Sequence, residues 1–442
     1  MNRLPRSRSD FIRHVLTLGS GKAGAGAVTL AATPVLSRLF DPIDFGVLAL
    51  FTSLCMTLGP LASLRLEQAI PLPKAEADAQ AIQRLCLRVI ASTCMLTVVV
   101  VATLILADVE SAALASLGQW LWLVPIGLLL LAGSLVQQWT LVRHKAYRAI
   151  AISDMAMAAS TAGSRVAAGL LLTSGPAGLI GGYLVGQLTR IAMLRAATRR
   201  LPASDPGPAP ALGAVARAYR DFPLLSAPRG FVRQLSQNLV VFVFAALFGA
   251  TALGWYAMAR RALLVPVVLV GESLRQVLLQ KLAEMRNRGD TLSGAYLKTV
   301  AALVLIGAPP FLFVGLYGDV LFEVVLGRNW RSAGQYAMLI TPWLFSLWLT
   351  VPANCVLIVL RRQGILLRME AVVAIARAAM FGLAFVAAFT PEVTLLLFSA
   401  LGVITNLGIM TQSYVLAHRS LPADESPTSR PVAGHRPLSA SR

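Results

Sequence analysis

Long apolar segments are the feature that most limits the folds open to this chain. Roughly a dozen runs, such as the one from Phe45 to Leu64, are long enough to cross a membrane, which takes about 20 apolar residues each. Inside lipid, the backbone polar groups of such a run must be satisfied within the segment, which favours helices. The sequence therefore predicts an all-α, polytopic membrane protein with little chain left for a soluble domain.

Composition agrees with this prediction and excludes other classes. The 442 residues are 57% hydrophobic and 13% charged, whereas soluble domains carry about 25% charged residues. The net charge of +19 comes mainly from Lys and Arg between alternate apolar runs, as expected of topology signals, so we expect no nucleic-acid binding. The four cysteines lack metal spacing and the four histidines lie outside the predicted spans, so we expect no metal and no cofactor.

Twelve spans are predicted, six on each side of a basic, Pro-rich segment. The first six cover about residues 11–36, 45–64, 86–107, 113–136, 149–172 and 177–194. The second six cover about residues 222–248, 253–279, 298–316, 333–360, 366–389 and 393–417. The predicted domains are an N-terminal six-helix lobe (1–200), a cytoplasmic linker (201–218), a C-terminal six-helix lobe (219–417) and a disordered cytoplasmic tail (418–442).

Charge asymmetry between the loops predicts the orientation. One set of loops holds most of the Lys and Arg, and the other is nearly free of them except for Arg38, Arg328 and Arg331. The positive-inside rule then places both termini and the linker in the cytoplasm. The longest outer loop is expected at residues 317–332.

The two halves resemble a repeat. An even number of spans per half gives both halves the same orientation, so the lobes should be related by a pseudo-two-fold axis along the membrane normal. The cleft between the lobes is then the expected pathway. The matched positions are Leu39, Phe40, Gly46 and Ala49 with Leu247, Phe248, Gly254 and Ala257, followed by Ser63–Arg65 with Ser273–Arg275.

Arginines inside the spans are the first candidates for a site, since intramembrane charges are costly. Arg260 and Arg261 lie deep in the eighth span. Consecutive residues diverge by about 100° on a helix, so one of the two should face the cleft, and we favour Arg260. Arg229 and Arg233 share a stripe with Gln237 in the seventh span, next to a proline and a glycine that could bend the helix.

Other charged residues allow both a functional and a structural interpretation. Arg65, Arg275 and Lys22 could bind substrate or could be ordinary residues at the cytoplasmic membrane boundary. Arg165 shares a face with Asp154, and Arg377 with Glu370, which favours internal charge compensation. Few carboxylates lie within or beside the spans, and the candidates for coupling to H⁺ or Na⁺ are Glu272 and Asp154.

The chain lacks a nucleophile constellation, a phosphate-binding loop and a pair of carboxylates for glycosyl chemistry, so we expect no enzyme activity. A cationic cavity at membrane depth should select an anionic, amphipathic substrate. Arginine matches phosphate oxygens through its planar donors, so a lipid-linked phosphate or pyrophosphate is the expected substrate class.

The opening hairpin, Ser37 to Lys74, is similar to that of the polysaccharide-repeat (O-antigen type) flippases. These belong to the multidrug/oligosaccharidyl-lipid/polysaccharide (MOP) exporter superfamily. The matching residues lie in LSRLFDPIDFG and LRLEQAIPLPK. Gly254-Trp255-Tyr256 through Arg260 and Pro266, and Gly327-Arg328-Asn329-Trp330, resemble the family's eighth span and outer loop.

The resemblance implies a bacterial inner-membrane transporter with two lobes. It would move undecaprenyl-pyrophosphate-linked oligosaccharide to the periplasmic leaflet by alternating access, for lipopolysaccharide or exopolysaccharide synthesis. Arg65 and Arg260 align with family positions. Membrane lipids, H⁺ or Na⁺ and other polysaccharide-assembly proteins are further candidate partners. The alternatives are a cation-coupled multidrug exporter of the same superfamily and a membrane glycan polymerase.

Overall fold

The structure is a computed structural model, and it describes residues 6–107, 116–171, 175–201, 210–360 and 362–419. Within these ranges the chain is helical and contains no strand. The N-terminal half comprises α1 (Arg6–Leu39), α2 (Pro42–Ala62), α3 (Glu76–Leu106), α5 (Val124–Arg143), α6 (Tyr147–Leu171) and α7 (Pro176–Arg199). The C-terminal half comprises α9 (Ala227–Asn287), α10 (Ser293–Leu326), α11 (Arg331–Leu349), α12 (Val351–Val359), α13 (Gln363–Val386) and α14 (Pro391–His418).

Short helical turns lie between several of these helices. They are the 3₁₀ turns η1 (Leu66–Ala69), η2 (Gly118–Leu123) and η4 (Arg328–Trp330), the π-helical turn η3 (Phe222–Ser226), and the helix α8 (Leu212–Ala218) within the predicted linker. The predicted tail lies, from residue 420 onward, outside the described residues.

The helices account for the predicted membrane crossings. In the described part of the chain, 8 helices are long and apolar enough to span a membrane, and α13 adds a shorter apolar stretch. The 61-residue α9 reverses direction at Gly249, where φ is 77° and ψ is 178°. Glycine suits this left-handed backbone because it lacks a Cβ. With α9 counted as two crossings, η2 and α5 as one, and α11 and α12 as one, the described helices make twelve.

One predicted boundary was wrong. Residues 317–332 were expected to form a loop, but α10 remains helical to Leu326, with a local kink at Tyr317. Residues 317–326 are mostly apolar apart from Asp319 and Glu323, and these two carboxylates, one turn apart on α10, both pair with Arg331, at 3.2 and 3.4 Å. The predicted tenth span, 333–360, is confirmed as one crossing. It contains a turn between α11 and α12, where the Thr350 hydroxyl donates to the Leu347 carbonyl and Pro352 follows.

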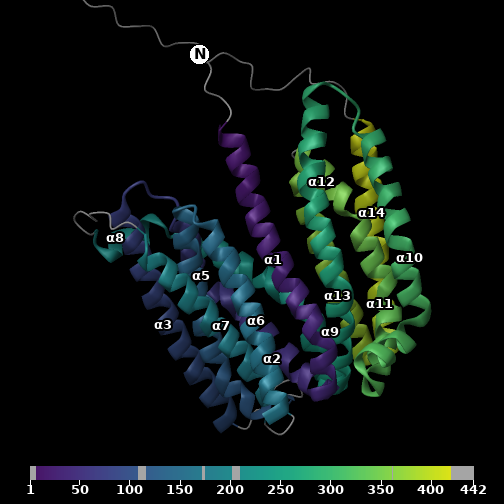
Figure 1. Cartoon of the computed structure of the whole chain (residues 1–442), viewed down its shortest axis with the longest axis horizontal. Coiled ribbons are helices and arrows are strands. Elements are labelled where there is room, and N and C mark those ends of the chain that lie inside the picture. Colours follow the sequence, from purple (N-terminus) through teal and green to yellow (C-terminus); the bar gives the residue numbers. More distant parts are fainter. Residues whose placement is uncertain (1–5, 108–115, 172–174, 202–209, 361, 420–442) are drawn as a thin grey trace, which may run out of the picture.

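The two halves form two lobes (Figure 1). Helices α3 and α5–α7 lie on one side, α10–α14 lie on the other, and α1 runs between them. The ribbons diverge at the end where the N-terminus and α8 lie, and they meet at the end of the α1–α2 turn. The contact between α2 and α9 is the largest in the fold, whereas α1 touches α9 only slightly.

The glycines of α1 permit close packing against α6. A Cβ added at Gly21 would overlap Ala151, and one at Gly24 would touch Met155 at 3.4 Å. At the other end of the pair, a Cβ at Gly169 of α6 would lie 2.9 Å from Leu39. Small residues at these positions let the helix backbones approach. Helix α1 is therefore packed against α6 of the N-terminal lobe from Gly21 to Leu39.

The two glycines matched by the repeat meet where the lobes cross. A Cβ at Gly46 would overlap the Ala250 carbonyl, and a Cβ at Gly254 would overlap the Pro42 carbonyl. The repeat that pairs Gly46 with Gly254 also pairs Pro42 with Ala250. The two contacts are therefore equivalent, as expected of a pseudo-two-fold axis passing through the crossing. We call this contact the glycine crossing.

Candidate functional site

Arg165 of α6 and Arg261 of α9 are charged residues within predicted spans of opposite lobes. Arg261 lies about 18 Å along the helix from the turn at Gly249, at 1.5 Å per residue. It is close enough to Arg165 for the two positive charges to repel each other. Arg165 itself is 5% exposed. Two arginines from opposite lobes therefore approach each other in the membrane interior.

The Arg165 side chain is held in place by the N-terminal lobe. Its Nε donates to the Leu179 carbonyl of α7 at 3.0 Å, and its stem lies against Gly182, where a Cβ would overlap it. Within electrostatic reach of it, the Tyr183 hydroxyl is buried and has no hydrogen-bond partner that meets the usual distance and angle criteria among the described residues. The Tyr183 ring packs edge-on against Phe51 at 5.9 Å. The position of the guanidinium is thus fixed by packing on α7 rather than by a carboxylate.

Arg260 points to different surroundings from its neighbour Arg261. Its charge acts on Tyr256 and on Arg377 of α13, both in the C-terminal lobe. The Nε atoms of Arg260 and Arg377 are buried and have no hydrogen-bond partner in the described structure. Arg377 lies over the aromatic rings of Phe398 and Trp343, 4.9 and 5.9 Å from their centroids. Cation–π contact gives a guanidinium partial compensation without a carboxylate.

Arg165 and Arg377 occupy corresponding places in the two halves, since each lies on the fifth crossing of its lobe. The fold thus places Arg165 within electrostatic reach of Arg261, and Arg377 within electrostatic reach of Arg260. No described carboxylate forms an ion pair with any of them. We call these four residues the arginine layer.

Asp154 does not compensate Arg165 as the sequence suggested. Its carboxylate accepts a hydrogen bond from Arg190 Nε of α7 at 2.8 Å. The remaining Arg190 donors reach Ser134 and Gln138 of α5, at 3.0 and 2.8 Å. Arg190 is therefore a buried cation with several partners and joins three helices, while Arg165 keeps an uncompensated charge. The side chain of Glu370, the expected partner of Arg377, lies outside the described side chains.

A second group of cations lies at the end of the lobes nearest the N-terminus. Arg229 and Arg233 are exposed on the first turns of α9. Arg65 comes from the other lobe, and its Nε would lie 2.8 Å from a Cβ added at Gly230. The expected bend at Pro228 is absent, because this proline occupies the first turn of α9, where proline is tolerated. The irregular segment is instead η3, just before it.

The other predicted site residues are more dispersed. Lys22 is exposed on α1. Arg275 is half-buried near the far end of α9, where its carbonyl faces the Cys355 thiol at 3.8 Å. The side chain of Glu272 lies outside the described side chains. The structure thus brings Arg65 close to Gly230, beside Arg229, and leaves Lys22 on α1 and Arg275 near the other end of α9.

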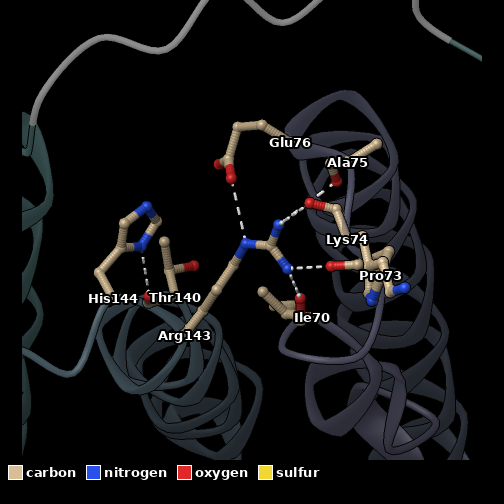
Figure 2. A network of polar contacts seen from close by, with 8 residues as sticks. All are labelled: Ile70, Pro73, Lys74, Ala75, Glu76, Thr140, Arg143 and His144. Carbon is tan, nitrogen blue, oxygen red and sulfur yellow. Dashed lines mark hydrogen bonds and ion pairs between the residues drawn. The ribbon is translucent and has the colours of Figure 1, made fainter.

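The segment that follows Arg65 is clamped by Arg143 at the end of α5 (Figure 2). Arg143 Nε donates to Glu76 at 3.0 Å. Its two Nη groups reach four backbone carbonyls, those of Ile70, Pro73, Lys74 and Ala75. Leu64 and Arg65 have positive φ values of 49° and 58°, which non-glycine residues rarely adopt. The clamp therefore lies directly after a strained turn that positions Arg65.

The opposite end of the lobe interface is closed by hydrogen bonds between the halves. The Ser37 hydroxyl donates to the Leu326 carbonyl at 2.9 Å, and the Trp330 indole donates to the Ser37 carbonyl at 2.8 Å. Asn329 Nδ2 donates to Asp41 at 3.1 Å. Trp330 is 0% exposed and meets Phe45 edge-on at 5.1 Å. Together with the glycine crossing, these contacts seal this end of the interface.

Sequence reasoning did not group the four residues of the arginine layer. It favoured charge compensation for Arg165 and Arg377 and ranked Arg261 below Arg260, because helix periodicity does not show which lobe each face contacts. The sequence does contain a signal, since Arg165 and Arg377 recur on the fifth span of each half. Among the described residues, no group of three or more His, Cys, Asp or Glu could hold a metal ion.

Comparison with known proteins identifies the fold. The chain is similar over 92% of its length to the lipid II flippase MurJ in an inward closed conformation, with a TM-score of 0.69, 12% identity and 90% of that chain covered. It is also similar to the MATE multidrug transporter DinF-BH in complex with R6G, with a TM-score of 0.59, 12% identity, and 93% and 97% of the two chains covered. A MATE family transporter of the MOP superfamily in an inward-facing conformation gives a TM-score of 0.51 at 12% identity, with 91% and 94% covered.

Sequence comparison gives the family. The amylovoran biosynthesis protein AmsL of Erwinia amylovora is 26% identical over 104 residues, which cover 24% of this chain and 27% of that protein. The match therefore spans about a quarter of this relative's length. A family model described as polysaccharide biosynthesis protein matches residues 35–335, from the end of α1 into α11. The chain is thus a multi-pass membrane protein with the fold of the MOP exporters and belongs to the polysaccharide biosynthesis protein family.

Proposed function

We propose that this protein is a flippase for lipid-linked oligosaccharides. Its substrate would be a polysaccharide repeat unit on undecaprenyl pyrophosphate, moved from the cytoplasmic to the periplasmic leaflet of the bacterial inner membrane. The observation that carries the proposal is the arginine layer, four cations from both lobes with no described carboxylate in an ion pair. A pyrophosphate would compensate these charges, and guanidinium groups match its oxygens well.

The distribution of contacts between the lobes supports a lipid-linked substrate. The lobes adjoin extensively through α2 and α9, while α1 and α9 touch only slightly. Figure 1 shows the lobes diverging beside α1. A lipid-linked substrate could keep its polyprenyl tail in the bilayer on the α1 side while its pyrophosphate lies between the lobes.

The distribution of Lys and Arg between the loops predicts the orientation of the protein in the membrane. This orientation sets the order in which a substrate from the cytoplasm would meet the two groups of arginines. With the termini and residues 201–218 in the cytoplasm, Arg229, Arg233 and Arg65 lie at the cytoplasmic mouth, and the arginine layer lies deeper. The pyrophosphate would first meet the mouth and then move to the layer. Coupling to H⁺ or Na⁺ through Asp154 would require that ion to displace Arg190 from its 2.8 Å ion pair.

The test is a leaflet assay in vesicles that contain the purified protein and a fluorescent lipid-linked oligosaccharide. We expect transbilayer movement of the substrate, detected by an impermeant quencher or lectin, and its loss in Arg165→Gln with Arg261→Gln. Arg84→Gln, a change to an exposed arginine of α3, is the matched control. The proposal would be refuted by vesicles that expel cationic dyes but do not move the lipid-linked oligosaccharide.

A further inference from the structure

A polar pocket lies at the sealed end of the lobe interface. It has a volume of about 350 Å³ and is lined by residues 37–41 and 326–330, within the roughly 300–1,000 Å³ typical of small-ligand sites. One wall is the turn between α1 and α2, and the other is the connection between α10 and α11. The pocket is therefore built jointly by the two halves, and we call it the outer pocket.

The hydrogen bonds between the halves fix the walls of the outer pocket. Ser37, Asp41, Asn329 and Trp330 use their polar groups on one another or on facing carbonyls. These contacts satisfy the backbone and side-chain groups of the two walls. They also hold Arg38 and Arg328, which come from opposite halves, around the same pocket.

The charges of the outer pocket are unusual for this side of the molecule. The loops on this side carry few basic residues, and Arg38, Arg328 and Arg331 are the exceptions. Arg331 is compensated by Asp319 and Glu323. Arg38 and Arg328 are exposed, and no described carboxylate lies within ion-pair distance of either. Two of the three exceptions therefore line one pocket, whose acidic lining residue, Asp41, accepts a hydrogen bond from Asn329 instead of pairing with a described arginine.

We propose that the outer pocket binds a phosphate-bearing lipid headgroup. The shared chemistry is a phosphate or pyrophosphate group bound by the guanidinium groups of Arg38 and Arg328, with the lipid tail in the adjacent leaflet. Guanidinium groups bind phosphate oxygens with charge-assisted hydrogen bonds. This site is separate from the arginine layer proposed to bind the transported substrate. Its assignment to the outer leaflet relies on the orientation proposed above.

Binding at the outer pocket is linked to closure of this end. Because the two arginines come from opposite halves, separation of the lobes would divide the site. A ligand that binds only the undivided site favours the closed arrangement. A headgroup in the outer leaflet would therefore help to close the transporter after release.

The test is arginine footprinting of the full chain in a phosphate-free detergent. Phenylglyoxal modifies accessible arginines, and peptide mass spectrometry reports each position separately. Inorganic pyrophosphate should suppress modification of Arg38 and Arg328 and should leave the fractional modification of Arg331 unchanged. The same experiment on Arg328→Gln should show loss of protection at Arg38, because the site is shared, whereas Arg331→Gln should retain it.

Two lipid probes distinguish the sources of the phosphate. Protection by polyprenyl pyrophosphate alone would assign the outer pocket to the lipid carrier, and protection by phosphatidylglycerol as well would assign it to headgroups in general. Both results support a phosphate site. Protection at neither arginine by any of these probes, or equal protection of Arg331, would overturn it. Neither outcome depends on whether the protein moves oligosaccharides.

Discussion

Arg260 and Arg261 are neighbours in the sequence, yet their charges act in different directions. Arg261 repels Arg165 of the opposite lobe, while Arg260 acts on Arg377 of its own lobe. We expect Arg261→Gln to reduce surface glycan by at least about tenfold, because one charged hydrogen bond contributes about 1.5–3 kcal/mol. Immunoblotting of surface glycan measures this, with membrane levels of the protein and Arg84→Gln as controls. Wild-type display would remove Arg261 from the site.

Arg143 should matter for stability rather than for binding. In the described structure, its guanidinium donates to four backbone carbonyls of one short segment, residues 70–75. It also pairs with the Glu76 carboxylate. Arg143→Lys keeps the charge but loses the planar fork of donors. We expect a loss of about 2 kcal/mol in the free energy of unfolding, as for charged hydrogen bonds in general.

Melting of the detergent-purified protein measures the effect of Arg143→Lys. Arg84→Lys is the matched control, because Arg84 is exposed and its Nε reaches only the Gln80 carbonyl, at 3.4 Å. Equal melting temperatures for the two variants would contradict the clamp. A large loss of transport in Arg143→Lys at unchanged stability would show instead that the clamp acts on the position of Arg65.

The burial of Glu67 predicts that the stability of the folded protein depends on pH. It lies in η1, between two spans, is 1% exposed, and has one carboxylate oxygen without a partner. Burial raises the pKa of the Glu67 carboxyl. The folded state then holds the proton to higher pH than the unfolded state, so stability is full at low pH and falls as pH rises through the raised pKa. Glu67→Gln should flatten this fall in melting temperature. The same slope in wild type and variant would show that Glu67 contributes nothing.

At the scale of elements, the glycine crossing brings the backbones of α2 and the second half of α9 into direct contact at the closed outer end. A side chain at Gly46 or Gly254 would overlap a carbonyl of the other lobe. We expect Gly46→Val and Gly254→Val to have the same effect, because the two contacts are equivalent. Each should leave the lobes folded and open the outer end, since the overlap lies between the lobes.

Labelling from outside tests the glycine crossing. A cysteine at Thr52, inward of the crossing, should react with an impermeant maleimide in cells only when Gly46 or Gly254 is replaced. Gly382→Val is the matched control, because a Cβ there meets nothing within 4 Å. If the control opens the outer end equally, or if only one of the two glycines matters, the crossing is not a symmetric seal.

The elements show which parts of the structure the sequence could predict. The spans follow from apolar length, and the Gly46–Gly254 match predicted which helices are equivalent. Partners between helices could not be predicted in the same way. Asp154 and Arg165 share a helix face, but the facing helix α7 supplies Arg190, and only tertiary packing decides between the two arginines. The outer boundary of α10 was missed because Asp319 and Glu323 indicated a loop, whereas both carboxylates pair with Arg331 and the apolar residues around them continue the helix to Leu326.

For the molecule as a whole, the proposed cycle requires the seal at the outer end to open. Asn329 Nδ2 and the Asp41 carboxylate join the two halves at 3.1 Å. A disulfide between Asp41→Cys and Asn329→Cys would hold them together, and the four native cysteines are all buried, so they should not compete. The oxidised double variant should be unable to release substrate to the periplasmic leaflet. The leaflet assay should show transport abolished after oxidation and restored by reduction.

The matched control separates locking from damage. Asp41→Cys alone and Asn329→Cys alone lose the same hydrogen bond but form no cross-link, so both should transport under oxidising conditions at the level of the reduced double variant. If the oxidised double variant still moves the substrate, the lobes need not separate at this end. Release would then have to occur elsewhere, and the place to examine is the side of α1, where the lobes touch least. A cross-link that blocks transport would therefore show that substrate bound at the arginine layer leaves through the outer end, and that the two lobes must separate there.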